Sequence, residues 1–176
     1  MSKLYFKPII TPRQVIEAGA FGGNYFGVDV GANLDDYKEL FKYHFDGLDT
    51  SLYLGEKYSP KLNAFKTRSG MPYEYWKEMG WMNERDPYGW FEWWCKYEMG
   101  QRGNDDDRQI TRWQNFSGVT GRWRLNIYSK IYNNSGDWKI GRRVQQSLLH
   151  WGYIVNKEDY DLWRTQRGIN NNILKQ

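Results

Sequence analysis

The side chains that could move protons in this chain are few, and His150 leads them. Only two histidines occur, His44 and His150, and they lie far apart in the sequence. His150 comes directly before Trp151, and a histidine beside aromatic rings can act as a general base near neutral pH. An acid such as Asp86 or Asp107 would then complete a catalytic pair. The alternative interpretation is a buried histidine that makes a structural hydrogen bond.

Thiol and metal chemistry have little support in the sequence. Cys95 is the single cysteine, which excludes an internal disulfide and a cysteine-based zinc site. Lys96 could lower the pKa of this thiol, whereas a cysteine in an aromatic helix is more often an inert core residue. The acids 105–107 could hold Mg²⁺ through one or two carboxylates, but neighbouring side chains at a helix start diverge. We therefore expect an acidic first turn, and no metal or cofactor.

The glycine-rich stretch 21–27 does not have the features of a phosphate-binding loop. It lacks the Gly-Lys-Ser/Thr ending of a P-loop and the preceding strand of a dinucleotide fold. It indicates a tight turn in which aromatic neighbours pack over the backbone. Nucleophile elbows, metalloprotease helices, calcium loops and zinc-finger spacings do not occur either.

Positive charge is concentrated in the second half of the chain. Residues 1–99 carry 12 Lys and Arg against 14 Asp and Glu, whereas residues 100–176 carry 13 against seven. Between Arg108 and Arg143 there are eight basic residues and one acid, Asp137. Six of the eight are arginines, whose planar fork suits phosphate and stacks on bases. This asymmetry predicts a polyanionic partner.

Arginines near tryptophans predict the residues of such a surface, because an aromatic ring can stack a base while an arginine holds its phosphate. The predicted nucleic-acid-binding residues are Arg102, Arg108, Arg112, Trp113, Arg122, Arg124, Arg142, Arg143 and Trp93. The alternative is a solvated helix face whose arginines pair with the acids 105–107. No module for reading base sequence is recognisable, so we expect binding without sequence specificity.

Ten tryptophans are present, and Trp90, Trp93 and Trp94 form the densest cluster with Phe91. Helical spacing places Trp90, Phe91 and Trp94 on a shared face, which favours a core over a stacking site. Trp93 lies nearly opposite to them, and we therefore take it as the ligand candidate of this helix.

Helix start and stop signals predict the elements that position these residues. Thr11-Pro12 starts a helix that Gly19 ends, and Asp86-Pro87 repeats the signal before a helix that runs to about Met99. Apolar spacing and flanking glycines predict further helices over 34–45, 72–79, 105–116, 122–132 and from 141 to about 151. We predict a mainly α protein: a single compact domain over residues 1–169 with six or seven helices. It would include a loop-rich segment over 48–70 and end in a frayed tail over 170–176.

Four sequence blocks resemble an uncharacterised family of small proteins found in fungi, plants, bacteria and bacteriophages. The blocks are residues 19–26, residues 80–93 with the string Asp-Pro-Tyr-Gly-Trp-Phe, residues 100–113 with Arg-Gln-Ile-Thr-Arg-Trp, and residues 146–153. Together they span nearly the whole chain. The resemblance implies a shared fold and no particular activity. The frequent Lys, Asn and Tyr resemble a bacteriophage member of the family.

We therefore expect a helical protein that associates with nucleic acid. No segment approaches the roughly 18 apolar residues of a membrane span, and the N-terminus lacks the features of a secretion signal. From these absences we expect a cytoplasmic protein without a membrane partner, in an infected host cell if it is a bacteriophage protein. Two alternatives stay open: an enzyme that acts on a nucleotide or a DNA base through an aromatic pocket, and a structural or host-interaction protein of a bacteriophage with a protein partner.

Overall fold

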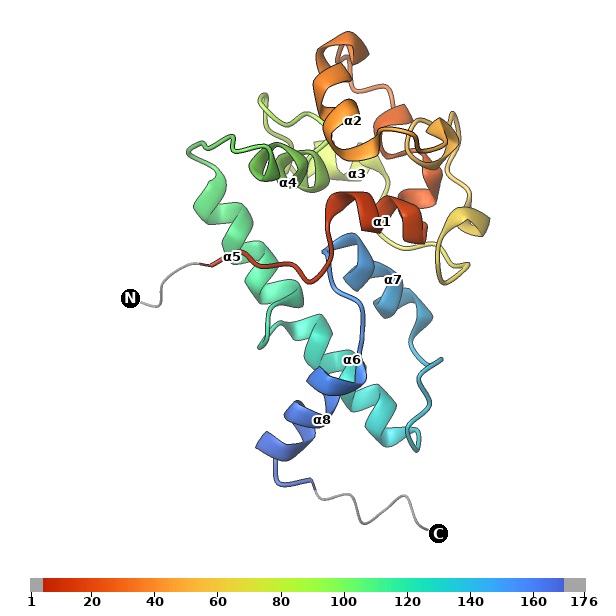
Figure 1. The fold of residues 1–176 in the computed structure, drawn as a ribbon, viewed down its shortest axis with the longest axis vertical. Helices are drawn as coiled ribbons and strands as arrows, with labels where there is room; N and C mark the ends of the chain where they lie inside the picture. The colour runs from red at the N-terminus through yellow and green to blue at the C-terminus, as the bar shows by residue number, and fades with distance from the viewer. Residues whose placement is uncertain (1–4, 170–176) are drawn as a thin grey trace.

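The computed structural model describes residues 5–169, and this part of the chain is mainly α-helical, without a β-strand (Figure 1). The predicted fold class is thereby confirmed, with eight α-helices in place of six or seven; the predicted tail 170–176 lies outside the described residues. The helices are α1 (Pro12–Ala18), α2 (Lys38–Phe45), α3 (Tyr73–Glu78), α4 (Trp90–Glu98), α5 (Asp106–Ser117), α6 (Arg122–Asn133), α7 (Arg142–His150) and α8 (Lys157–Gln166). Five 3₁₀ helices accompany them: η1 (Phe21–Gly23), η2 (Tyr25–Gly27), η3 (Leu34–Tyr37), η4 (Thr50–Leu52) and η5 (Pro60–Leu62).

Side-chain caps precede α1 and α8, and the structure differs from the prediction at the start of α4 and at α8. The hydroxyl of Thr11 accepts from the Gln14 N–H and Gln14 reaches back to the Thr11 N–H, a capping box before α1. Asp86 is not the cap of α4: that helix starts at Trp90, because Gly89 adopts φ 89° and turns the chain there. α8 was not predicted, although the Asn156 side chain accepts from the Asp159 N–H at its start.

The first hydrophobic core surrounds α4. Phe91, Trp93, Trp94 and Cys95 are completely buried. The ring of Phe6, from the segment before α1, lies between 5.2 and 6.0 Å from five aromatic rings in edge-on arrangements. Because consecutive residues 90–95, which cover every side of the helix, are all buried, α4 forms the centre of this part of the molecule.

A second core joins α6, α7 and α8 through Ile127, Ile131, Leu148 and Trp163. Figure 1 shows α5 and α6 following each other along one diagonal, with α8 at the lower end. Trp151, just after α7, connects the two cores: its ring stacks on Trp90 at 4.1 Å and on Phe116 at 4.7 Å. The two cores are therefore continuous through stacked rings.

The predicted loop-rich segment 48–70 contains η4 and η5 and is held by buried amides. Asn63 is completely buried; its oxygen accepts from the Gly22 N–H at 2.8 Å and its nitrogen donates to Thr67 O at 2.8 Å. Gln146 of α7 accepts from the Phe65 N–H at 3.0 Å. These bonds satisfy backbone groups that would otherwise be buried without partners, and they fix the segment against the first turns of α7.

Within residues 5–169, every helix is too short or too polar to cross a membrane.

Candidate functional site

His150 occupies a structural position at the end of α7. Its Nε2 lies 3.1 Å from the Phe21 backbone nitrogen and 3.0 Å from Gln146 Nε2, and its ring stacks on Phe21 at 4.2 Å. Both nitrogens are donors, so Nε2 accepts and the ring is neutral. Burial lowers the pKa of His150 to about 3. The structure does not bring it together with Asp86 or Asp107, which fits the alternative of a buried structural histidine.

His150→Gln is expected to make the free energy of unfolding less dependent on pH below neutral pH. In the unfolded chain His150 is protonated below about pH 6.5, whereas in the folded protein it stays neutral down to about pH 3. As the pH is lowered from about 6 to about 4, the free energy of unfolding therefore decreases by about 1.4 kcal/mol per pH unit. Gln retains an acceptor near the position of Nε2 and does not titrate.

Urea unfolding of the wild type and of His150→Gln across this pH range measures the difference in slope. His44 is present in both proteins, so its own lowered pKa cancels in the comparison. Identical pH profiles for the two proteins would mean that His150 is protonated in the folded state, contrary to the hydrogen bonds that Nε2 accepts.

The tryptophans predicted to stack a ligand are closed to solvent. Trp93 is 0% exposed and donates from its indole nitrogen to Asp106 Oδ1 at 2.9 Å. Trp113 is 4% exposed and donates to Trp151 O at 3.0 Å. The expectation that these two rings are available to a ligand is wrong, because Trp93 on α4 and Trp113 on α5 both belong to the first hydrophobic core. The core interpretation of Trp90, Phe91 and Trp94 is confirmed.

Two of the predicted arginines are neutralised by carboxylates. Arg124 is buried, lies 2.8 Å from Asp159 Oδ2 and donates to the Tyr128 hydroxyl at 2.9 Å. Arg108 is exposed but donates to both oxygens of Asp105. The prediction that Arg124 belongs to a binding surface is therefore wrong. Arg108 pairs with an acid that precedes it in the chain, as the alternative interpretation expects.

Three further predicted arginines lie on aromatic rings. Arg102 packs at 3.6 Å on the ring of Tyr97 and donates to backbone carbonyls. Half-buried Arg112 lies 5.4 Å from the Trp151 ring, and exposed Arg122 lies 4.8 Å from the Trp123 ring. In Figure 1 the start of α5 and the link between α6 and α7 lie at opposite edges of the molecule.

Arg142 and Arg143, by contrast, are exposed and lie at the start of α7, against segment 48–70, which carries further exposed cations. The name basic surface is used below for the exposed cations of these two parts of the chain, of the end of α6 and of the link between α6 and α7: Lys61, Lys66, Arg68, Lys130, Lys139, Arg142 and Arg143. Arg142 Nε donates to Phe65 O at 2.9 Å, and Lys66 Nζ donates to Lys61 O at 2.8 Å. The Ser69 hydroxyl donates to Arg143 O at 3.3 Å. These contacts hold the end of segment 48–70 beside the start of α7.

The link between α6 and α7 completes this surface. The Lys130 side chain lies beside Gly141, where an added Cβ would be 3.3 Å from its Cδ. Gln145 donates at 2.8 Å to the carbonyls of Trp138 and Ile140, which holds Lys139 near the first turn of α7. The indole ring of Trp138 is 38% exposed here. The basic surface therefore borders an aromatic ring that is open to solvent.

Within the described residues, no carboxylate forms an ion pair with a member of the basic surface. The binding residues predicted from the sequence did not include Lys61, Lys66 and Arg68, nor Lys130, Lys139 and Trp138. A signal for the first three was available, since residues 57–69 contain four cations and no acid. Only the fold shows that this stretch lies against α7.

Asp86 belongs to a buried charged cluster on α4 and the turn before it. Lys96 Nζ lies 2.7 Å from Glu92 Oε1 and 3.2 Å from Asp86 Oδ1, and it donates to Arg85 O. Glu92 also accepts from the Tyr37 hydroxyl at 2.6 Å. Asp86 is 1% exposed, and neither of its oxygens has a hydrogen-bond partner among the described residues. Burial raises the pKa of both carboxyls, while Lys96 opposes this shift.

The remaining candidates do not form a reactive centre. Cys95 is completely buried, and burial raises the pKa of its thiol, as expected for an inert core residue. Asp107 is exposed on the first turn of α5. Residues 5–169 bring together no group of three His, Cys, Asp or Glu side chains that could hold a metal ion.

Comparison with known proteins does not add a homologue to this picture. No family model, no curated protein and no solved structure matches the chain. The resemblance to a family of small fungal, plant, bacterial and bacteriophage proteins, and the bacteriophage origin, therefore stay predictions. What can be said of function comes from the geometry of the chain itself.

Proposed function

We propose that the protein binds nucleic acid through the basic surface, without reading base sequence. The observation that supports this best is the unpaired state of its cations: seven exposed Lys and Arg side chains meet with no carboxylate partner among the described residues. Exposed cations grouped in this way attract a phosphate backbone, because its condensed counterions are released on binding.

The arrangement of the cations favours a backbone over a single phosphate. They come from segment 48–70, from the end of α6, from the link that follows it and from the start of α7, so a ligand that contacts several of them has to be extended. Asp137 is the one acid within residues 130–143, and its carboxylate accepts from the Lys139 backbone N–H at 2.9 Å. A chain of phosphates can contact several of these cations at once.

Trp138 favours single-stranded nucleic acid as the ligand. Its ring, 38% exposed, packs edge-on against Tyr160 at 5.3 Å and is therefore held in place from one side. A base that stacks on such a ring contributes about 1–3 kcal/mol, and stacking requires an unpaired base. Trp138→Ala is expected to weaken single-strand binding more than duplex binding.

The test is fluorescence anisotropy with labelled single- and double-stranded oligonucleotides at about 50 and about 200 mM salt. The variant Lys61→Gln/Lys139→Gln/Arg143→Gln removes three cations from three segments of the basic surface. We expect its affinity at low salt to fall at least about tenfold, and its salt slope to fall by about one for each lost phosphate contact.

The matched control removes three exposed cations elsewhere, Lys7→Gln/Lys42→Gln/Lys77→Gln, with the same change in net charge. It should bind within about twofold of the wild type, because distant exposed charges are screened over about 10 Å. Absence of binding to either oligonucleotide at low salt, or equal losses in both triple variants, would overturn the proposal.

A further inference from the structure

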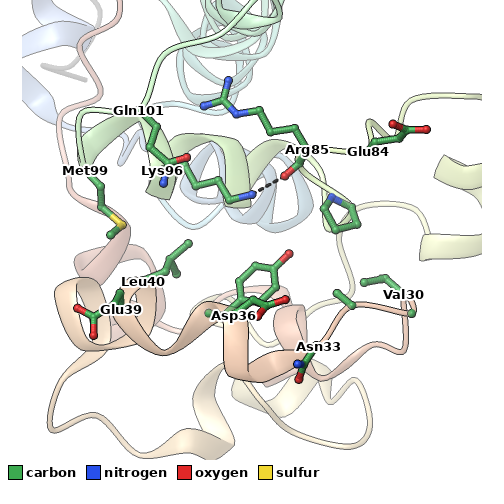
Figure 2. A pocket seen from close by; sticks show the side chains of 14 residues that line it. Val30, Asn33, Asp36, Glu39, Leu40, Glu84, Arg85, Lys96, Met99 and Gln101 are labelled. Atoms are coloured by element: carbon green, nitrogen blue, oxygen red, sulfur yellow. Dashed lines mark hydrogen bonds between the residues drawn. The ribbon is translucent and has the colours of Figure 1, made fainter.

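A cavity of about 600 Å³ lies between the segment 30–40 and the C-terminal end of α4 (Figure 2). The ammonium of Lys96, which lines it, is already engaged by Glu92, Asp86 and the Arg85 carbonyl. The acids that line the cavity are exposed surface side chains: Asp36, Glu39 and Glu84. These groups select no particular ligand, and we assign none to the cavity.

A row of aromatic rings, by contrast, leads from Trp138 to the C-terminal end of α8. The exposed ring of Trp138 lies edge-on at 5.3 Å from the ring of Tyr160, which stacks at 5.8 Å on Trp163. The guanidinium of Arg167 lies over the Trp163 ring, 5.1 Å from its centre. Arg167 directly follows α8, and its side chain is exposed. The row therefore connects the open ring beside the basic surface with a further exposed cation.

The separation of Trp138 and Arg167 is small on the scale of a nucleic-acid strand. The consecutive contacts that join them measure 5.3, 5.8 and 5.1 Å. Because stacked nucleotides rise by about 3.4 Å each, the guanidinium lies within about five nucleotides of a base that stacks on Trp138. Trp138 is also tied to the basic surface, since its carbonyl accepts from Gln145 of α7 at 2.8 Å. One strand can therefore contact the basic surface, Trp138 and Arg167 together.

The positive charge of Arg167 is not neutralised by the acids of α8. Within residues 5–169 no carboxylate forms an ion pair with it; Asp159 pairs with Arg124, and Asp161 pairs with Lys157. Glu158 precedes Arg167 by about two and a half helical turns and therefore lies on the opposite side of α8. The Trp163 ring covers one face of the guanidinium and leaves the N–H groups at its edge for a phosphate, which suits the planar fork of arginine.

We propose that a bound single strand continues from Trp138 to the end of α8, where Arg167 holds one of its phosphates. This inference rests on the proposed function and extends it to a residue outside the basic surface. The ring of Trp138 can stack only an unpaired base, and a single strand is flexible enough to follow the row of rings onto α8. Arg167 is then the contact that holds the strand beyond the stacked base.

The experiment measures the fluorescence anisotropy of a labelled oligothymidylate of about 12 nucleotides between about 50 and about 200 mM salt. We expect Arg167→Gln to weaken binding about fivefold at low salt and to reduce the salt slope by about 0.7, the value for one phosphate contact of a single strand. Arg167→Lys keeps the charge and should retain the slope. A variant that only loosened α8 would lose affinity without a change in the slope.

The matched control is Lys42→Gln, which removes one exposed positive charge on α2. It should bind within about twofold of the wild type with an unchanged slope. The inference is overturned if Arg167→Gln binds like the wild type, if it loses affinity with an unchanged slope, or if Lys42→Gln reduces the slope equally. In these three outcomes the wild type still binds, so the proposed function stands. Absence of binding by the wild type would overturn both.

Discussion

Lys96→Met is expected to lower the free energy of unfolding by about 3–5 kcal/mol. The lysine is the counter-charge of Glu92 and Asp86, at 2.7 and 3.2 Å, and these two side chains are 0% and 1% exposed. Methionine fills much of the same space, so the loss comes from leaving two carboxyls buried without a cation. Denaturant unfolding near neutral pH measures it.

The deficit of Lys96→Met is expected to grow as the pH rises. Burial raises the pKa of Asp86 and Glu92 above the values of an unfolded chain, and the loss of Lys96 raises them further. Between the unfolded and the folded pKa the folded protein binds the extra protons, so its stability falls as the pH rises through that window. The variant should therefore differ least from the wild type near about pH 4.

Two further variants separate the charge from the shape of this cluster. Lys77→Met removes an exposed lysine on α3 and should change stability by no more than about 0.5 kcal/mol. Adding Asp86→Asn and Glu92→Gln to Lys96→Met removes the unpaired charges and should recover a large part of the loss. A loss below about 1 kcal/mol in Lys96→Met would show that the carboxyls are neutral in the folded protein or find other partners.

The helices were largely predictable because their ends are encoded locally. Thr11, Pro12 and Gln14 form the start of α1 without help from the rest of the chain. The start of α4 was misjudged because the signal at Asp86-Pro87 is overridden by the turn at Gly89 and by the burial of Asp86. In that case tertiary contacts decide which of two neighbouring residues precedes the helix.

The candidate sites were predictable only in part, because they depend on contacts between distant segments. Arg142 and Arg143 were selected correctly as exposed cations, but the partners that extend their surface lie about 80 residues earlier and reach it through Phe65 and Ser69. The Glu92–Lys96 spacing could have indicated a buried pair, since the other residues of α4 before Glu98 are aromatic or Cys95. The cavity needs segment 30–40 beside α4, which no local pattern shows.

Trp93→Ala is expected to lower the free energy of unfolding by about 3–5 kcal/mol, the range for truncating a large buried aromatic residue. Trp93 is completely buried, and its ring lies 5.3 Å from those of Phe6 and Trp90. The same side chain ties α4 to α5, since its indole donates to Asp106, whose other oxygen accepts from the Gly103 N–H. Thermal and urea unfolding measure the loss.

Trp93→Phe separates these two roles, because it keeps an aromatic ring in the core and removes the indole N–H. It should lose less than Trp93→Ala while still leaving Asp106 without its donor from α4, a cost of about 1 kcal/mol. Trp81→Ala is the matched control, because this tryptophan is 40% exposed and its truncation should cost about 1 kcal/mol or less. If Trp93→Ala were no more destabilising than Trp81→Ala, Trp93 would have to lie at an accessible face of α4. Its ring would then again be a candidate for stacking a ligand.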